Sequence, residues 1–509
     1  MTRINTNVQS LLAQRILGQN NNQLGQALER LSTGLKINRG GDDPAGLIAS
    51  QNLRAEKAGL GAAINNAERA EQVVNIAEGG LQEVSGLLTE LEGLITATAN
   101  TAGLSAEEKE ANQLQIDSIL QTIDRVSEST SFQGNKLLNG NFGYEVTGVD
   151  ANIDSFKING AKLEFGQTRD VDVLVTQSAQ QAGYFLSTGG ALDLSAADAQ
   201  FILEVGGSKG SRELSFASGT AVADIVAAIN SFSDVTGVSA AASGGGFRVD
   251  SVEYGSNEFV SVKVVDDGDL NGQVATAGVY ALASSDTAVA SAAATTAFSA
   301  GAAENGLSDD GQDVGATING VVATTKGTKA SISTDFLSVD IDLSATGATT
   351  PGNINAFTIQ GGGADFQLAS NVDIAGKVSI GIDNVAVRNV GKTSDSGTDY
   401  TLADLGSGKG LSVIDGDLSV AQDVVSQAIK DISGLRGRIG AFQKNTVGAT
   451  IRSLGVALEN TTAAESAIRD ADFAAETASL TRSQILSQSA TNVLSLANAQ
   501  PQNVLALLG

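Results

Sequence analysis

A heptad pattern between Leu53 and Thr98 constrains the fold of this chain more than any other feature. Twelve of its fourteen core positions are apolar, and Glu, Gln, Asn and Arg lie between them. Apolar residues repeated every 3.5 positions draw helices into a left-handed coiled coil, although one helix of an ordinary bundle gives the same pattern. The two rows are Leu53, Leu60, Ala67, Val74, Leu81, Leu88 and Ile95, and Glu56, Ala63, Ala70, Ala77, Val84, Leu91 and Thr98.

A second apolar row near the other end of the chain supplies a partner for this helix. Its members are three and four residues apart, which is the spacing of a helical seam. Helix is expected from about Ser419 to Gln500, with breaks near 446–449 and after Asn460. The row consists of Leu418, Ala421, Val425, Ala428, Ile432, Leu435, Ile439 and Phe442.

Residues 141–410, between the two seams, have a different character. Alternating apolar and polar residues at 171–175 and 260–264 predict strands, and residues 221–230 predict a short helix. We expect an α+β module at 201–265, a mostly β module at 315–390 and a loose Ala/Ser/Thr linker at 280–303. Five Asn-Gly pairs predict hairpin turns; they begin at Asn139, Asn159, Asn271, Asn305 and Asn319.

Composition excludes several classes of function. The chain has no Cys and no His, which removes thiolate chemistry and the usual general base and metal ligand. The net charge of −26 argues against nucleic acid and anionic membranes as partners. Asp-rich stretches at 266–269 and 309–313 lack the full spacing of a calcium loop, so they are expected to form turns. No cofactor and no catalytic residue is expected.

Both ends of the chain carry helical apolar stripes without an obvious core to receive them. The first stripe lies within residues 1–35, followed by a loop and a helix start in which Asp43 caps and Pro44 occupies the first turn. The two stripes could pack on each other, yet much apolar surface would stay open, and such surface marks interaction sites. Self-association is therefore expected. The stripes are Leu24, Leu28, Leu31 and Leu35, and Leu486, Ala490, Val493 and Ala497.

Short motifs at both ends resemble those of the bacterial flagellin family. At the N-terminal end they are residues 31–38, 42–47, 123–126 and 132–138; at the C-terminal end they are residues 438–443, 459–460, 466–473, 484–486, 497–498, 501–502 and 504–505. The module at 201–265, with Ile229-Asn230 and residues 254–256, resembles the "IN" motif of flagellin and hook-protein insertions.

The resemblance implies a multidomain α+β subunit, with terminal coiled-coil helices, a helical rod built from both ends and inserted mainly-β outer domains. The implied segments are 1–41 (N-terminal inner coiled coil), 42–180 (N-terminal rod with a β-hairpin), 181–300 (outer α+β module with the IN motif), 301–404 (second outer β-rich module), 405–460 (C-terminal rod) and 461–509 (C-terminal inner coiled coil).

The resemblance also implies a function as the self-assembling subunit of the flagellar filament. Such a subunit is exported unfolded through the flagellar type III channel without a cleavable signal peptide, and it forms a helical homopolymer outside the cell. Its implied partners are an export chaperone, the filament cap and the hook-junction proteins. The alternatives are a hook–filament junction protein and a filament subunit whose outer domain also acts as an adhesin.

We expect the assembly interface to involve both terminal stripes and the rod seams. A further expectation concerns the animal toll-like flagellin receptor, which recognises the outer face of the long rod helix. At Leu88, Glu90, Leu91 and Leu94 the leucines of the family pattern are kept, but Glu90 stands where receptor-binding members have Arg, so activation should be weak. The interface residues are Leu24, Leu28, Leu31, Leu35, Leu53, Leu60, Val74, Leu81, Leu88, Ile432, Leu435, Ile439, Phe473, Leu486, Val493 and Ala497.

Overall fold

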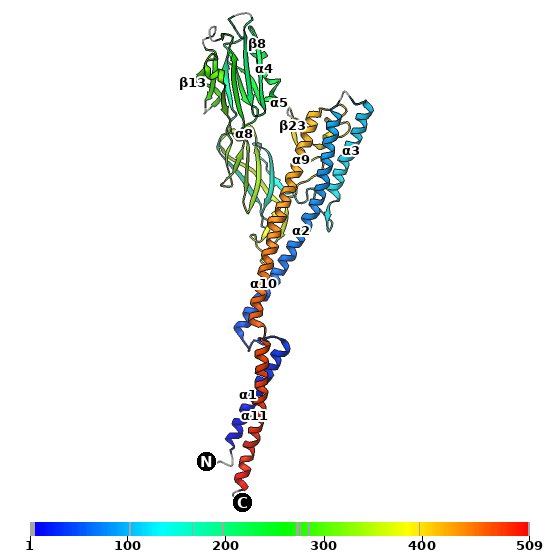
Figure 1. The fold of residues 1–509 in the computed structure, drawn as a ribbon, viewed down its shortest axis with the longest axis vertical. Helices are drawn as coiled ribbons and strands as arrows, with labels where there is room; N and C mark the ends of the chain where they lie inside the picture. The colour runs from blue at the N-terminus through cyan, green and yellow to red at the C-terminus, as the bar shows by residue number, and fades with distance from the viewer. Residues whose placement is uncertain are drawn as a thin grey trace. The chain divides into compact units, whose positions relative to one another are not determined.

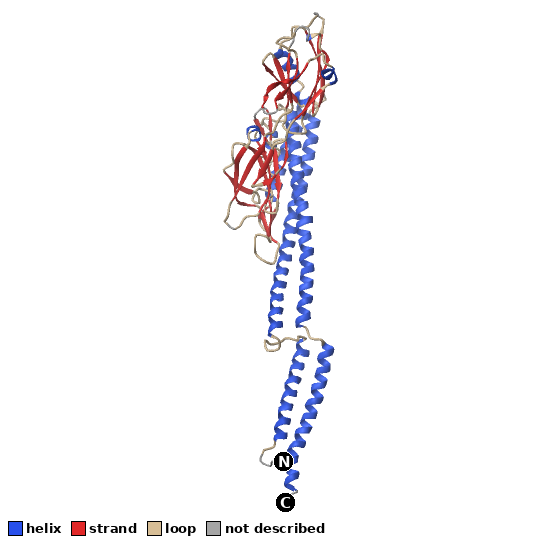
Figure 2. Cartoon of the chain, turned by 90° about the vertical axis from the view of Figure 1, so that its left-hand side faces the viewer, coloured by secondary structure: helices blue, strands red, loops and turns tan. Residues whose placement is uncertain are grey.

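The computed structural model describes residues 6–100, 103–164, 166–195, 198–270, 274, 276–283, 286–395 and 398–506. Long helices come from both ends of the chain and strands from its middle (Figures 1 and 2). The helices are α1 (Val8–Thr33), α2 (Pro44–Thr98), α3 (Ala106–Ser129), α4 (Val222–Asn230), α5 (Ser233–Thr236), α7 (Gly301–Asn305), α8 (Ala345–Thr349), η1 (Leu402–Leu405), α9 (Leu418–Ala441), η2 (Phe442–Val447), α10 (Gly448–Arg469) and α11 (Phe473–Ala506).

Most of the strands form two β-sandwiches, and β1-β2, β21-β22 and β23-β24 form three separate two-stranded sheets. The strands are β1 (Ser131–Phe132), β2 (Asn135–Lys136), β3 (Tyr144–Thr147), β4 (Ile153–Ala161), β5 (Arg169–Gln177), β6 (Gly183–Ser187), β7 (Gln200–Gly207), β8 (Gly210–Ala217), β9 (Val238–Ser243), β10 (Gly246–Ser251), β11 (Phe259–Asp266), β12 (Gly278–Ala283), β13 (Asp286–Thr296), β14 (Leu307–Asp310), β15 (Gly315–Ile318), β16 (Val321–Val322), β17 (Thr324–Lys326), β18 (Lys329–Ser333), β19 (Leu337–Leu343), β20 (Gly352–Gly362), β21 (Ala364–Gln367), β22 (Lys377–Ile380), β23 (Thr393–Asp395) and β24 (Thr398–Tyr400).

The chain divides into two compact units. The first unit comprises Met1–Asn75, Phe366–Val378 and Ile439–Gly509, and the second comprises Ile76–Asp365 and Ser379–Arg438. The boundary falls within α2 and within α9, so each of these helices contributes to both units.

In the first unit, α1 and α11 lie side by side (Figures 1 and 2). Asn7 caps α1 by accepting a hydrogen bond from the backbone N–H of Ser10, and Gly34 ends the helix in the left-handed conformation at φ 72°. The carboxylate of Asp43 accepts a hydrogen bond from the backbone N–H of Gly46, which confirms the predicted cap before Pro44.

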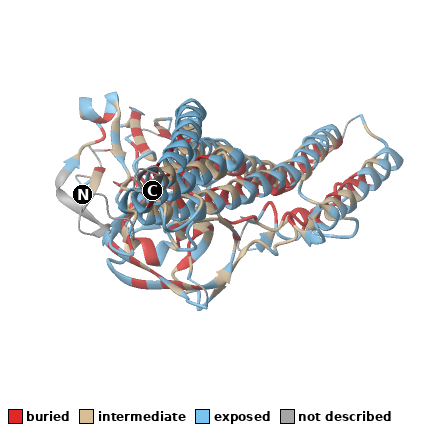
Figure 3. Cartoon of the chain, turned by 90° about the horizontal axis from the view of Figure 1, so that it is seen from below, coloured by how far each residue is buried: buried red, intermediate tan, exposed pale blue. Residues whose placement is uncertain are grey.

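The predicted seams are confirmed as buried sides of long helices. On α2 the seam positions from Leu60 to Thr98 are buried, and on α9 those from Ala421 to Ile439 are buried. Figure 3 shows buried positions in red on helices whose remaining surface is mostly exposed or half-buried. A capping box of Ser105 and Glu108 begins α3.

The expected helix break at 446–449 is wrong. The helix continues through η2, a π-helix in which the Gly448 N–H donates to the Gln443 carbonyl five residues earlier. The cause is one extra residue in the seam. After Phe442 the next buried residue is Val447, at a spacing of five. The half-buried Ile451, Leu454 and Leu458 then continue the 3–4 spacing to the buried Thr461. A π-turn absorbs such an insertion without ending the helix.

The expected break after Asn460 is also wrong, because α10 runs to Arg469. The helix stops at Asp470, whose backbone is extended and pairs with Leu35 in an isolated β-bridge. Lys36 N–H donates to the Arg469 carbonyl at 2.7 Å beside this bridge. The helix therefore ends where the chain pairs with the linker that follows α1.

In the second unit, one sandwich has sheets ordered β16-β15-β5-β20-β3 and β17-β18-β19-β4. Its core joins residues 153–179 with residues 314–359, so strands before the inserted module pair with strands after it. The other sandwich has sheets ordered β13-β12-β6-β10-β9 and β14-β11-β7-β8, and α4 packs on its core. The predicted short helix at 221–230 is therefore confirmed as α4.

The loose linker expected at 280–303 is wrong where the structure describes it. Strands β12 and β13 pair with each other, β12 also pairs with β6, and α7 follows. Small Ala, Ser and Thr side chains do not prevent the backbone from completing a hydrogen-bonded ladder. The composition of this segment therefore predicted a linker where the chain forms the edge of a sheet, strands β12 and β13.

The Asn-Gly signals have different outcomes. Asn319-Gly320 forms the predicted hairpin between β15 and β16, with φ of 49° and 80°. Asn159 lies inside β4 as an extra residue between two paired positions, and Asn305-Gly306 ends α7. Asn139-Gly140 connects β2 to β3, which pair with β1 and β20 and not with each other. Asn271-Gly272 lies outside the described residues.

Candidate self-assembly surfaces

Small and polar residues form the contact between α1 and α11. Rows of buried residues seven positions apart run along each helix, which lets the two helices approach closely. The rows are Ala13, Asn20 and Ala27 on α1, and Ser483, Ala490 and Ala497 on α11.

Hydrogen bonds and the ion pair of Arg30 with Glu476 fix the register of this contact. The Asn7 side chain donates to the Ala497 carbonyl at 2.8 Å, and the Asn20 side chain donates to the Leu486 carbonyl at 3.2 Å. The Ser10 hydroxyl donates to Asn498 at 2.7 Å. Polar contacts therefore supplement the small buried residues and the half-buried Leu24 and Leu31 between the terminal helices.

The large apolar side chains of the same helices point outward. Leu11 is 61% exposed and Leu496 is 69% exposed, values that are unusual for leucine. On α1 the exposed residues from Val8 to Ile16 follow a spacing of three and four, which places them on one stripe; Leu28 lies outside it. The outward residues are Val8, Leu11, Leu12, Ile16 and Leu28 on α1, and Phe473, Ile485, Leu486, Val493 and Leu496 on α11.

The structure separates the predicted terminal residues into two groups. Leu28, Phe473, Leu486 and Val493 are exposed, whereas Leu24, Leu31 and Leu35 are half-buried and Ala497 is buried against α1. Sequence reasoning missed the outward Val8, Leu11, Leu12, Ile16, Ile485 and Leu496. Two features of the sequence could have predicted them: the spacing of the apolar residues on α1, and the small residues repeated every seven positions on both helices.

The predicted rod residues lie inside the chain's own fold. Leu53 is half-buried, and the others have at most 5% of their surface exposed. These side chains leave no surface for a neighbouring subunit, so they stabilise the subunit itself. The enclosed residues are Leu60, Val74, Leu81, Leu88, Ile432, Leu435 and Ile439.

Charged groups hold the segment between α1 and α2. The backbone N–H groups of Arg39 and Asn38 donate to the Asp42 carboxylate at 2.9 and 3.0 Å and lower the pKa of that carboxyl. Further along the same unit, Glu465 of α10 lies 3.3 Å from Lys57 and 3.7 Å from Arg54 of α2. These contacts order the links beside the terminal helices.

Within the described part of the chain, no cluster of three or more potential metal-ligating side chains is found. The Asp-rich stretch at 266–269 forms the expected turn, in which Asp266 and Asp267 accept backbone hydrogen bonds from Gly268 and Asp269. The turn expected at 309–313 is wrong, because Asp309 and Asp310 belong to β14 and Gln312 pairs with Gln180 in an isolated bridge. Among the described helices, none is both long and apolar enough to span a membrane.

Comparisons with known proteins agree with this architecture. The "Bacterial flagellin N-terminal helical region" matches residues 4–143, and the "Bacterial flagellin C-terminal helical region" matches residues 422–508. Between them, the "Flagellin hook IN motif" matches residues 200–252. Flagellin B of Helicobacter pylori is 27% identical over 545 residues, which cover 99% of each chain. The chain belongs to the bacterial flagellin family.

Flagellin B of Vibrio cholerae is similar over the same extent, at 26% identity over 506 residues and 99% of each chain. Among solved structures, FliC from Burkholderia pseudomallei is 14% identical, with a TM-score of 0.23 over 74% of this chain and 99% of that one. The D1-D2-D3 domains of the cap protein FliD from Escherichia coli are 18% identical, with a TM-score of 0.26 over 55% of this chain and 62% of that one.

This flagellin is a structural subunit of the flagellar filament, which lies outside the cell and serves motility.

The four residues expected to face the animal receptor differ in their exposure. Leu88 and Leu91 are fully buried on α2, whereas Glu90 is exposed and Leu94 is half-buried. Glu90 and Leu94 are therefore the members of that set with side-chain surface to offer a receptor.

Proposed function

We propose that this flagellin polymerises through the outward apolar stripes of its terminal helix pair. One observation carries the proposal: the buried positions between α1 and α11 hold small or polar residues, and several large apolar residues of both helices, Leu11 and Leu496 among them, stay exposed. Neighbouring subunits that cover these stripes remove apolar surface from water. Each Å² of apolar surface buried in this way contributes about 25 cal/mol of favourable free energy. Contacts that repeat head to tail without closing a ring build a helical filament.

The remaining parts of the proposal come from the family. The chain is exported unfolded without cleavage of a signal peptide, and the terminal helices order as subunits assemble. An export chaperone, the filament cap and the hook-junction proteins are its proposed partners. The role is structural and involves no catalysis. A hook–filament junction protein is the alternative, and an adhesive outer domain is compatible with a filament subunit.

Sedimentation and electron microscopy of the purified chain test the proposal. Full-length protein should form filaments, and a variant without residues 1–41 and 461–509 should remain monomeric. A sharper comparison uses Leu11→Gln with Leu496→Gln, which should raise the critical concentration at least about tenfold, equivalent to about 1.4 kcal/mol per subunit. Val322→Gln is the matched control, because Val322 is 80% exposed but lies on β16.

Two outcomes contradict the proposal. Polymerisation of the truncated chain would show that the terminal helices are not the assembling elements. If the full-length chain forms no filaments even on seeds, the junction-protein function gains support instead.

A further inference from the structure

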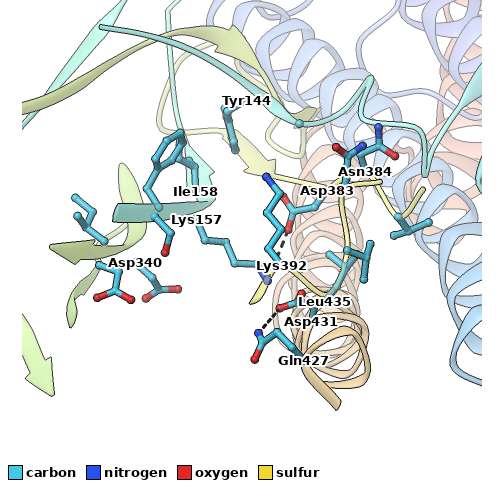
Figure 4. Close-up of a pocket in the computed structure, with 18 of the residues that line it drawn as sticks. Tyr144, Lys157, Ile158, Asp340, Asp383, Asn384, Lys392, Gln427, Asp431 and Leu435 are labelled. Carbon is cyan, nitrogen blue, oxygen red and sulfur yellow. Dashed lines mark hydrogen bonds and ion pairs between the residues drawn. The ribbon is translucent and has the colours of Figure 1, made fainter. Parts of the chain in front are cut away.

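A groove of about 710 Å³ lies within the second unit, between the sandwich that contains β4 and the helix α9. One wall consists of residues from β4, β18 and β19, and the other consists of α9 and the segment 383–392. Figure 4 shows Lys157 and Asp340 on the strand side and Gln427 and Asp431 on the helix.

The strand wall of this groove is polar. Cross-strand pairing places Ser331 beside Asp340 and Asp340 beside Lys157, and the next row holds Lys329, Asp342 and Ser155. Lys329 and Asp342 also form an ion pair at 3.5 Å. A sheet face that packs permanently against a helix carries apolar side chains, whereas a face of Lys, Asp and Ser keeps its water. Apolar packing therefore does not hold this sheet face against α9.

A small polar cluster joins the two walls instead. Arg438 of α9 donates from Nη2 to Asp383 Oδ2 at 2.8 Å and from Nη1 to the side-chain oxygen of Asn159. Lys157 Nζ lies 3.8 Å from the same oxygen of Asp383. We name Arg438, Asp383, Asn159 and Lys157 the polar latch.

The bulge in β4 brings Asn159 into this latch. Ile158 pairs with Val339 and Gly160 pairs with Ser338, so Asn159 is the extra residue between two adjacent pairs. A bulge redirects the side chain of its extra residue. The Asn159 amide donates to Asp340 at 2.8 Å and its oxygen accepts from Arg438, so one side chain bridges the sheet and the helix.

We propose that the polar latch is a conformational device that fixes the orientation of this sandwich on α9, and that opening the latch lets the sandwich move into the groove. The latch can open because its groups are within reach of water: Asp383 is 41% exposed and Lys157 is 35% exposed. Partly exposed ion pairs contribute little net stability and weaken as salt rises. The hydrated groove gives the sandwich room to move without exposing a core.

Distance measurement between two spin labels tests the latch directly. The chain contains no Cys, so Lys329→Cys on β18 and Lys430→Cys on α9 give two unique attachment sites on exposed positions. In this background we expect a narrow distance distribution at low salt. Arg438→Ala should broaden it about twofold or add a second population, and 1 M salt should act in the same direction without a mutation.

Arg436→Ala is the matched control. Arg436 lies two residues before Arg438 on α9, but its ion pair at 2.8 Å is with Glu78 of α2. This variant should leave the distribution unchanged. If Arg438→Ala folds normally by circular dichroism and the distribution stays narrow, the latch does not set the orientation.

Milder variants decide the question if Arg438→Ala fails to fold. Asn159→Ser and Asp383→Asn each remove one connection to Arg438 and keep its charge. Broadening in both supports the latch, and a wild-type distribution in both overturns it.

Discussion

Arg30 of α1 and Glu476 of α11 form an ion pair, with Nη1 and Oε1 3.1 Å apart, although 446 residues separate them in the chain. The side chains are 23% and 15% exposed, so both charges are largely withdrawn from water. The pair fixes the direction in which the terminal helices run past each other. It adds a charged interaction to the small buried residues between the two helices.

Glu476→Ala should loosen the terminal helix pair in the monomer. The change leaves the Arg30 guanidinium largely buried without its partner, at an expected cost of about 1–3 kcal/mol. Amide hydrogen exchange along α1 should accelerate accordingly. Glu29→Ala is the control, because its partner Arg39 is 75% exposed. Equal exchange in both variants would show that the buried pair contributes no more than the exposed one.

Leu88→Ala should destabilise the second unit. Leu88 has no exposed surface, and its truncation leaves a cavity that costs about 2–5 kcal/mol. Leu114→Ala on α3 should cost less than about 0.5 kcal/mol, because Leu114 is 68% exposed. Urea unfolding followed by circular dichroism measures both. Similar midpoints for the two variants would contradict the seam as the core of the rod.

Deletion of Asn445 should convert η2 into α-helix. The deletion removes the extra residue and places Val447 four positions after Phe442, so the seam becomes continuous. Deletion of the exposed Gly455 instead rotates the following part of α10 by about 100° about the helix axis. Thr461 then leaves its buried position, and Glu465 moves away from Arg54 and Lys57. Urea unfolding should show little loss for the first variant and a clear loss for the second. Equal loss would mean that the π-turn is required for packing.

The variant Asp309→Asn should change how the stability of the β7-containing sandwich depends on pH. Burial raises the pKa of Asp309, and the nearby charge of Asp310 raises it too, although the Gly183 N–H donates to it at 2.8 Å. The folded state therefore binds a proton more tightly than the unfolded state does. Stability from this group is present below the unfolded pKa near 3.8 and is lost as pH rises through the higher folded pKa.

Thermal unfolding of wild type and Asp309→Asn between pH 3 and 7 measures this effect. The variant should gain stability relative to wild type as pH rises, because Asn keeps an oxygen for the Gly183 N–H without the charge. A difference in melting temperature that is independent of pH would contradict the assignment to Asp309.

Glu90→Arg should increase activation of the animal flagellin receptor. Glu90 is exposed on α2, so the substitution changes surface charge without disturbing the buried Leu88 and Leu91. A receptor reporter cell line should respond weakly to wild type and more strongly to the variant. A wild-type response equal to that of a strong agonist would show that Glu90 does not limit recognition.

Local periodicity explains what could be predicted from the sequence. A helix places residues three, four and seven apart on one side, so the row from Leu60 to Ile95 was enough to predict α2, and the row from Ala421 to Ile439 was enough for α9. The skip from Phe442 to Val447 is equally visible in the sequence, but whether it ends the helix or forms a π-turn depends on packing. The motifs at both ends were sufficient to recognise the family.

Tertiary structure decided the features that depend on residues far apart in the chain. Strand β5 pairs with β15 and β20, which follow it in the chain only after the inserted module, and no local pattern encodes such a distant partner. Pairing of β4 with the distant strand β19 likewise makes Asn159, predicted to lie in a hairpin turn, the extra residue of a bulge whose side chain contacts Arg438. On the terminal helices, the sequence by itself determined that apolar stripes exist. Only the pairing of α1 with α11 decided that Ala13 and Ala490 are buried and that Leu11 and Leu496 are exposed, because closely packed helices favour small side chains where they approach most closely.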